Sequence, residues 1–391
     1  MFLASTSRHS LRQSNRFSSL YAVTSAALHA IGETVLHPIV VLPAIAFLLG
    51  GSNYQVAAFA AIALASWALA PLLMLMLRSI SGRPYPIVFG AGIVRLGAIA
   101  AVGVMGFRID DVSADRIVST LIGSYLAYQV ASAIAVQASA SLIASGVPGS
   151  RQVITFRRRS FAAVAAAVAG ACAVWSVFRS DESFQDSVGL ILMFAAIAIF
   201  SATWFLLSIP GGAVSSPMPR PGRLPATINN AFRAAAFRRY ISFKLLLALA
   251  AAVDPFLIVY GFQQLGLDVE HIGWAIVAIA SGQAVGFLVW PAWVARHGPR
   301  VPFQVATLLR LLLLTWVVAL PTISTSRVYA DRFDSPDAAM RGFALGFVLL
   351  GLAASAGNVA NQRYVMEIAP RDTVQGSVSY THLTLPTIYS V

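Results

Sequence analysis

Four charged side chains stand inside otherwise apolar stretches of this chain, namely Glu33, Arg95, Asp254 and Arg310. Each costs about 3 kcal/mol at the centre of a bilayer on insertion scales, so each must face a partner or a water-filled cavity. Two uses of the carboxyl groups fit. They can take up and release protons, or each can pair with the arginine of its own half of the chain and hold two helices together. The residues alone leave both uses open.

Two histidines share a helical face with Glu33. His29, Glu33 and His37 are spaced i, i+4 and i+8. These groups could form hydrogen bonds between helices or into a cavity, relay protons because imidazole titrates near neutral pH, or bind a transition metal. The spacing fits all three uses, although we expect no resident metal or cofactor. Pro38 and Pro255 follow His37 and Asp254 directly, so each predicts a weakened turn with freed carbonyl groups.

The composition indicates which elements must hold these groups. Hydrophobic residues make up 58% of the chain and charged residues 11%, with a mean hydropathy of +0.76, which is typical of a membrane protein. About 20 apolar residues cross a bilayer core as a helix. We therefore expect an all-α polytopic membrane protein with ten transmembrane helices, at 20–49, 55–77, 87–106, 117–145, 160–178, 187–208, 245–263, 272–294, 303–322 and 342–361.

Loop charges alternate between the two sides. The segments 1–19, 78–86, 146–159, 209–244, 295–302 and 362–376 hold 19 Lys and Arg residues and two acids. The segments 107–116, 179–186, 264–271 and 323–341 hold six Lys and Arg residues and 11 acids. The positive-inside rule therefore predicts a cytoplasmic N-terminus. The net charge of +12 is thus explained by topology and does not indicate nucleic-acid binding.

The chain divides into two related parts. Residues 1–208 form a predicted N-terminal half with six spans, 209–244 a cytoplasmic linker rich in Pro, Gly and Ser at its start, and 245–376 a C-terminal half that contains spans 7–10. Glu33 and Asp254 are 221 residues apart, Arg95 and Arg310 215 residues apart. Such a repeat is a signature of one transporter architecture.

Two loops carry a resemblance to a known family. "APLLMLMLRSISGRPYP" (70–86) and "WPAWVARHGPRVP" (290–302) resemble degenerate copies of a cytoplasmic loop motif of the major facilitator superfamily. The matching residues are Gly82, Arg83, Arg296, Gly298 and Arg300, whereas Ser79 and Ala295 replace the acidic residue of the motif. The resemblance implies that fold, with two six-helix bundles in a complete member, and a loop that helps the halves rock.

The same resemblance predicts a central cavity. In the family spans 1, 4, 7 and 10 line it, which would bring Glu33 and Asp254 there. Polar side chains on spans 4 and 10 suit a substrate path: Tyr125, Gln129, Ser132, Ser355, Asn358 and Gln362. The alternative for each is a hydrogen bond between helices, worth about 0.6 kcal/mol on average.

The last residues do not fit this pattern. "SVSYTHLTLPTIYSV" (377–391) has no charge and is too short to span a bilayer, and it resembles translated vector sequence. We therefore expect 377–391 to be a non-native tail and the chain to be truncated after span 10.

These features predict a secondary transporter of the bacterial inner membrane, working as a monomer by alternating access. Its partners would be a small molecule of unidentified class, protons and the lipid bilayer, with efflux favoured over uptake. No Walker or G-x-S-x-G motif occurs, and Cys172 is the single cysteine, so no enzyme is expected. The alternatives are a membrane enzyme of the acyl- or glycosyltransferase type and a non-transporting receptor or scaffold.

Overall fold

The computed structural model describes residues 3–80, 83–107, 113–147, 149–180, 182–209, 235–328, 331 and 335–368. Gly82, most of the expected linker and the expected tail at 377–391 lie outside these residues. The described helices are α1 (Leu3–Val35), α2 (Val41–Leu48), α3 (Asn53–Ile80), α4 (Pro84–Gly106), α5 (Ala114–Gly146), α6 (Gly149–Phe178), α7 (Phe184–Leu207), α9 (Ala235–Ala251), α10 (Asp254–Leu265), α11 (His271–His297), α12 (Arg300–Ser324) and α13 (Pro336–Ile368).

Eight helical segments of the described residues are long and apolar enough to cross a membrane. They are Pro84–Gly106, Ala114–Gly146, Arg151–Phe178, Phe184–Leu207, Arg238–Leu265, His271–His297, Arg300–Ser324 and Asp337–Asn361. Each coincides with a span expected from the sequence. A shorter apolar helical segment, Asn53–Ser66, lies in the expected second span.

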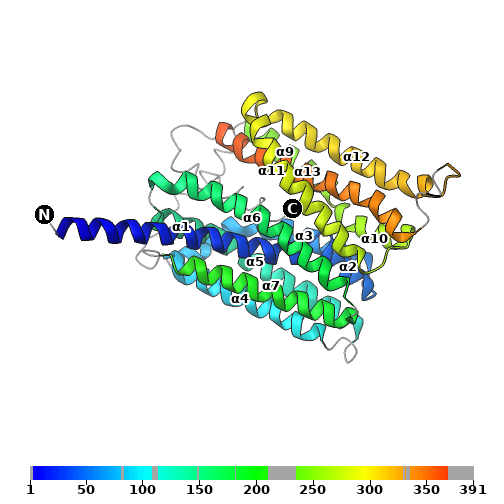
Figure 1. The fold of residues 1–391 in the computed structure, drawn as a ribbon, viewed down its shortest axis with the longest axis horizontal. Coiled ribbons are helices and arrows are strands. Elements are labelled where there is room, and N and C mark those ends of the chain that lie inside the picture. Colours follow the sequence, from blue (N-terminus) through cyan, green and yellow to red (C-terminus); the bar gives the residue numbers. More distant parts are fainter. Residues whose placement is uncertain are drawn as a thin grey trace.

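The helices pack as two groups (Figure 1). In the first, α1 packs on α6 and α7, α4 packs on α5 and α7, and α3 packs on α5. In the second, α13 packs between α11 and α12. Helix α6 of the first group also packs along α11 of the second. The chain thus folds into an N-terminal and a C-terminal set of helices that meet along α6 and α11.

One apolar cluster joins the two groups at the end that carries α2 and α10. It includes Leu42 of α2, Ile258 of α10 and Ile272 of α11. In the same region Phe47 of α2 stacks on Phe262 of α10, with 5.9 Å between ring centroids. At the opposite end each group has an apolar cluster of its own. The groups are therefore joined by this cluster at one end, in addition to the contact along α6 and α11.

Two expected spans are interrupted helices. The first span is split between α1 and α2 at residues 36–40, where the Leu42 amide donates to the His37 carbonyl at 3.2 Å. The seventh is split between α9 and α10 at residues 252–253. Pro38 and Pro255 explain both breaks, because a proline ring removes an amide donor and clashes with the preceding turn. The weakened turns predicted from these prolines are present.

Small residues let α11 and α13 approach closely. Gly282 and Gly286 are four residues apart on α11, as are Gly351 and Ser355 on α13. A Cβ atom added to Gly351 would overlap the carbonyl oxygen of Ile279. Such spacing is typical of helix pairs in membranes, where close backbone contact replaces hydrophobic driving force. The two helices therefore form one tightly interlocked pair.

This contact predicts a sharp difference between two glycines of α13. We expect Gly351→Ala to destabilise the protein by about 1–3 kcal/mol, because the added methyl group must displace the backbone of α11. Gly357→Ala is the matched control, since a Cβ atom there meets nothing within 4 Å. Thermal unfolding of the purified protein measures both. Equal stability of the two variants would contradict the close approach.

Candidate functional site

Glu33 lies in the last turn of α1, buried inside the first group of helices. Its carboxylate accepts a hydrogen bond from the Tyr128 hydroxyl of α5. The Nε2 atom of His29, one turn earlier, lies 3.7 Å from Oε1. Both neighbours can be neutral. The site therefore holds a carboxyl group that can exist with or without its proton.

Arg95 does not contact Glu33 directly. Its guanidinium, buried on α4, donates to the Thr203 hydroxyl of α7 at 2.5 Å. The Thr203 hydroxyl in turn donates to the Ile199 carbonyl oxygen at 3.0 Å. The ion pairs that involve the four charged candidates among the described side chains, within 4.0 Å, are His29–Glu33 and Arg310–Asp254. Arg95 is thus held by α7, and Glu33 has no arginine in contact.

Asp254 is in a different position. It begins α10 and is 2% exposed. Arg310 of α12 places Nη1 at 2.9 Å from Oδ2 and donates to Oδ1 at 3.1 Å. This is the acid–arginine pair that the sequence offered as one of its two alternatives. The negative charge of Asp254 is compensated, and the pair ties α10 to α12.

His37 lies at the break between α1 and α2. It is 8% exposed, and among the described residues neither ring nitrogen has a hydrogen-bond partner. A buried polar group without a partner is rare in native proteins and calls for an explanation such as a bound water or ligand. His37 is therefore the candidate site residue with most free hydrogen-bonding capacity.

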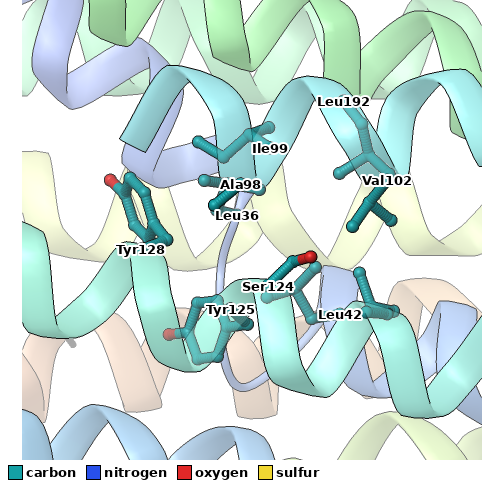
Figure 2. A pocket seen from close by; sticks show the side chains of 10 residues that line it. Leu36, Leu42, Ala98, Ile99, Val102, Ser124, Tyr125, Tyr128 and Leu192 are labelled. Atoms are coloured by element: carbon teal, nitrogen blue, oxygen red, sulfur yellow. The ribbon is translucent and has the colours of Figure 1, made fainter. Parts of the chain in front are cut away.

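The polar residues of α5 face inward within the first group. Tyr125, Gln129 and Ser132 are all buried, and Gln129 donates to the Tyr125 hydroxyl at 2.5 Å. Beside Tyr125 and Tyr128 lies a cavity of about 10 Å³, room for about one water molecule. Figure 2 shows the Ser124 hydroxyl and apolar side chains lining it. These residues form a buried polar set next to Glu33.

The candidate residues of α13 lie against α11 or are only half-buried. Ser355 accepts from the Trp290 indole at 3.1 Å and donates to the Leu352 carbonyl at 2.9 Å. Asn358 is half-buried. The side chain of Gln362 lies outside the described part of the structure. Ser355 therefore has its hydrogen-bonding capacity used within the α11–α13 pair.

The loop residues lie at helix ends. Arg83 precedes α4, Arg296 is in the last turn of α11 and Arg300 begins α12; all three are exposed. Gly298 ends α11 with φ of 75°, a backbone conformation that favours glycine because it has no Cβ atom. This glycine sets the direction of the short connection to α12.

Sequence reasoning did not select Tyr128 or Thr203. Both are hydroxyl-bearing residues inside apolar spans, and that is the only signal the sequence offers for them. Their importance depends on which helices meet, because each bonds a charged residue on another helix.

Comparison with protein-family models and with curated proteins finds no match. Solved structures do match. A variant of the nucleoside transporter NupG is 13% identical, with a TM-score of 0.63, covering 96% of this chain and 88% of its own. A bacterial homologue of the iron transporter ferroportin, in an inward-facing state, is 14% identical with a TM-score of 0.58, covering 97% and 90%. A D-xylose–proton symporter is 16% identical with a TM-score of 0.56, covering 96% and 88%.

These neighbours are transporters of the major facilitator type, and at such low identity they show the fold. The chain therefore has the major facilitator fold, as the loop motifs and the repeat predicted. A multi-pass membrane protein follows from the same likeness and from the apolar helices.

The ion pair of the second group yields a stability prediction. Asp254→Asn or Arg310→Gln alone leaves one buried charge uncompensated, which costs about 3 kcal/mol. Replacing both residues removes both charges, so we expect the double variant to be more stable than either single variant. Thermal unfolding of the three purified proteins measures this. Strictly additive losses would show that the pair does not stabilise the α10–α12 contact.

Proposed function

We propose that this protein is a secondary transporter that moves a small molecule by alternating access and is coupled to protons. The observation that carries the proposal is the pair of interrupted helices, α1/α2 and α9/α10, each with a buried carboxyl group at its break. In transporters, binding sites are typically built at interrupted helices near the bilayer midplane. The major facilitator fold supports the same activity by analogy.

The proposed architecture has ten spans in this chain. Residues 1–208 would form a six-helix bundle, 209–244 a cytoplasmic linker and 245–376 the start of a second bundle. With the N-terminus in the cytoplasm, the apolar cluster that joins α2, α10 and α11 lies at the outer end. The arrangement then corresponds to a state that is closed to the outside. The proposed location is the bacterial inner membrane, with the protein as a monomer.

Glu33 is the proposed proton-exchanging group. A buried carboxylate without a contacting cation is costly, so the neutral acid is favoured while Glu33 is enclosed. His29 at 3.7 Å can accept or return the proton, so the two residues can hold one proton between them. Tyr128 donates to the carboxyl group and holds it in place. Water reaching Glu33 in the opposite conformation would favour release of the proton.

Asp254 and Arg310 have a different proposed role. Because their charges compensate each other at 2.9 Å, Asp254 has less reason to exchange a proton than Glu33. We assign the pair to the stabilisation of one conformation. Substrate would contact His37 at the first break, because this imidazole has free hydrogen-bonding capacity.

The candidate substrate classes come from the similar solved structures. The similar solved structures are named for nucleosides, xylose and iron. The acidic residue in the first span is similar to one that proton-linked exporters of the family carry there. This similarity favours efflux. Candidates for the transport assay therefore include nucleosides, sugars, divalent metals and cationic drugs.

The decisive experiment uses the protein in proteoliposomes under an imposed pH gradient. We expect substrate-dependent proton movement in the native protein. Glu33→Gln should reduce gradient-driven accumulation at least tenfold while substrate exchange without a gradient continues, because only the proton site is lost. Glu182→Gln, an exposed acid in the loop before α7, is the control and should behave as the native protein. Unchanged coupling in Glu33→Gln would refute the assignment, and no flux of any substrate would favour a scaffold.

The proposed orientation is tested by labelling cysteines. Cys172→Ala removes the single thiol, after which Thr325→Cys and His297→Cys each place one thiol at an exposed position. In intact cells a membrane-impermeant maleimide should label the variant at 325. The variant at 297 should react only after the membrane is permeabilised. The reverse pattern would place the N-terminus outside.

A further inference from the structure

A group of three potential metal ligands lies where α11 and α13 begin. Glu270 precedes α11, His271 is its first residue and Asp337 is in the first turn of α13. One ligand atom from each residue lies within 4.8 Å of the others. The His271 side chain is buried, whereas that of Asp337 is 63% exposed. The group thus has a buried ligand, His271, on one side and is open to solvent at Asp337.

The spacing suits one metal ion. Nε2 of His271 lies 3.2 Å from Oδ1 of Asp337. Two ligands at about 2.05 Å from a tetrahedral Zn²⁺ ion are roughly 3.3 Å apart. The imidazole and the carboxylate therefore already have the separation of neighbouring ligands. Glu270 is half-buried, and a carboxylate oxygen of its side chain lies within 4.8 Å of the other two ligand atoms, so it is the candidate third ligand.

The backbone of Asp268 offers a hydrogen-bond partner to Nδ1 of His271 in either tautomer. Its amide lies 2.9 Å from Nδ1 and its carbonyl oxygen 3.3 Å from the same atom. In one tautomer Nδ1 accepts from the amide and Nε2 donates to Asp337. In the other, Nδ1 donates to the carbonyl oxygen and the Nε2 lone pair faces the two carboxylates. Metal-bound histidines almost always donate their second nitrogen in this way.

Charge and packing both favour a divalent cation. In the second tautomer a lone pair and two carboxylates face one another, an arrangement that a positive ion between them would stabilise. Two carboxylates balance the charge of a divalent ion, and imidazole favours transition metals such as Zn²⁺ and Co²⁺ over Mg²⁺ or Ca²⁺. The interlocked glycines of α11 and α13 hold the two helices in fixed register, so His271 and Asp337 are preorganised.

We propose that Glu270, His271 and Asp337 form a binding site for a divalent transition-metal ion that joins the first turns of α11 and α13. Water would complete the coordination from the exposed side. None of these three residues belongs to the proposed proton or substrate site, so the proposal does not depend on the proposed transport activity. The location of the site also differs from the His29–His37 stripe that the sequence suggested.

Binding of Co²⁺ to the purified full chain tests this proposal. The protein carries no polyhistidine tag, is stripped with a chelator, and is titrated with Co²⁺ while visible absorption and metal content are measured. We expect one tightly bound ion per chain, with an absorption spectrum typical of low coordination number and competition by Zn²⁺. Asp337→Asn and Glu270→Gln should each weaken binding at least tenfold, since each removes a ligand charge.

Two variants keep the test independent of folding. Asp337→Asn alters an exposed residue, so its thermal unfolding without metal should match that of the native protein. Asp331→Asn removes an exposed acid from the connection between α12 and α13 and should bind Co²⁺ as the native protein does. Added Zn²⁺ should raise the unfolding temperature of the native protein and of Asp331→Asn, but not of Asp337→Asn. No bound ion, or equal binding in all these proteins, would overturn the proposal.

Discussion

The cost of placing a charge in an apolar environment governs this structure. The carboxyl groups of Glu33 and Asp254 are stabilised in different ways. Asp254 receives a full countercharge from Arg310 at 2.9 Å. Glu33 receives a hydrogen bond from Tyr128 and a histidine neighbour, with no arginine in contact among the described ion pairs. One carboxyl group is therefore suited to a permanent charge and the other to a variable one, although the sequence repeat predicts corresponding positions for them in the two halves.

The backbone is subject to the same constraint. Each interrupted helix exposes amide and carbonyl groups that hydrocarbon cannot satisfy, so the breaks must be enclosed by protein or water. Helix α2 is enclosed by α3 and α10, and α10 contacts helices of both groups. At the second break, however, Ala252 and Val253 are exposed. The tight α11–α13 pair provides a rigid wall beside them. The first break, at residues 36–40, is therefore the one that lies inside closely packed protein.

Sequence reasoning recovered the features that depend on composition and local pattern. The apolar segments predicted the helices, Pro38 and Pro255 predicted the breaks, and the repeated loop motif predicted the fold. The Asp254–Arg310 pair was foreseen as one alternative because both residues are costly in isolation.

Features that depend on which helices face each other could not be predicted from the sequence. Arg95 bonds Thr203 of α7 instead of contacting Glu33, since the orientation of α4 decides what its guanidinium reaches. Ser355 was selected for its polar side chain, yet it packs against α11 beside Gly286. The meeting of His271 with Asp337, 66 residues apart, likewise depends on helix packing. No local pattern encodes such contacts.

The short length of α2 and α10 has a mechanical consequence. They contain 8 and 12 residues, so at a rise of 1.5 Å each they are about 12 and 18 Å long, well short of the bilayer core. A short segment beyond a break can tilt as a lever without dragging the longer helix that precedes it. The two ends of the protein can then change shape at different times. An occluded intermediate, shut on both sides, thereby becomes a natural stage of the proposed cycle.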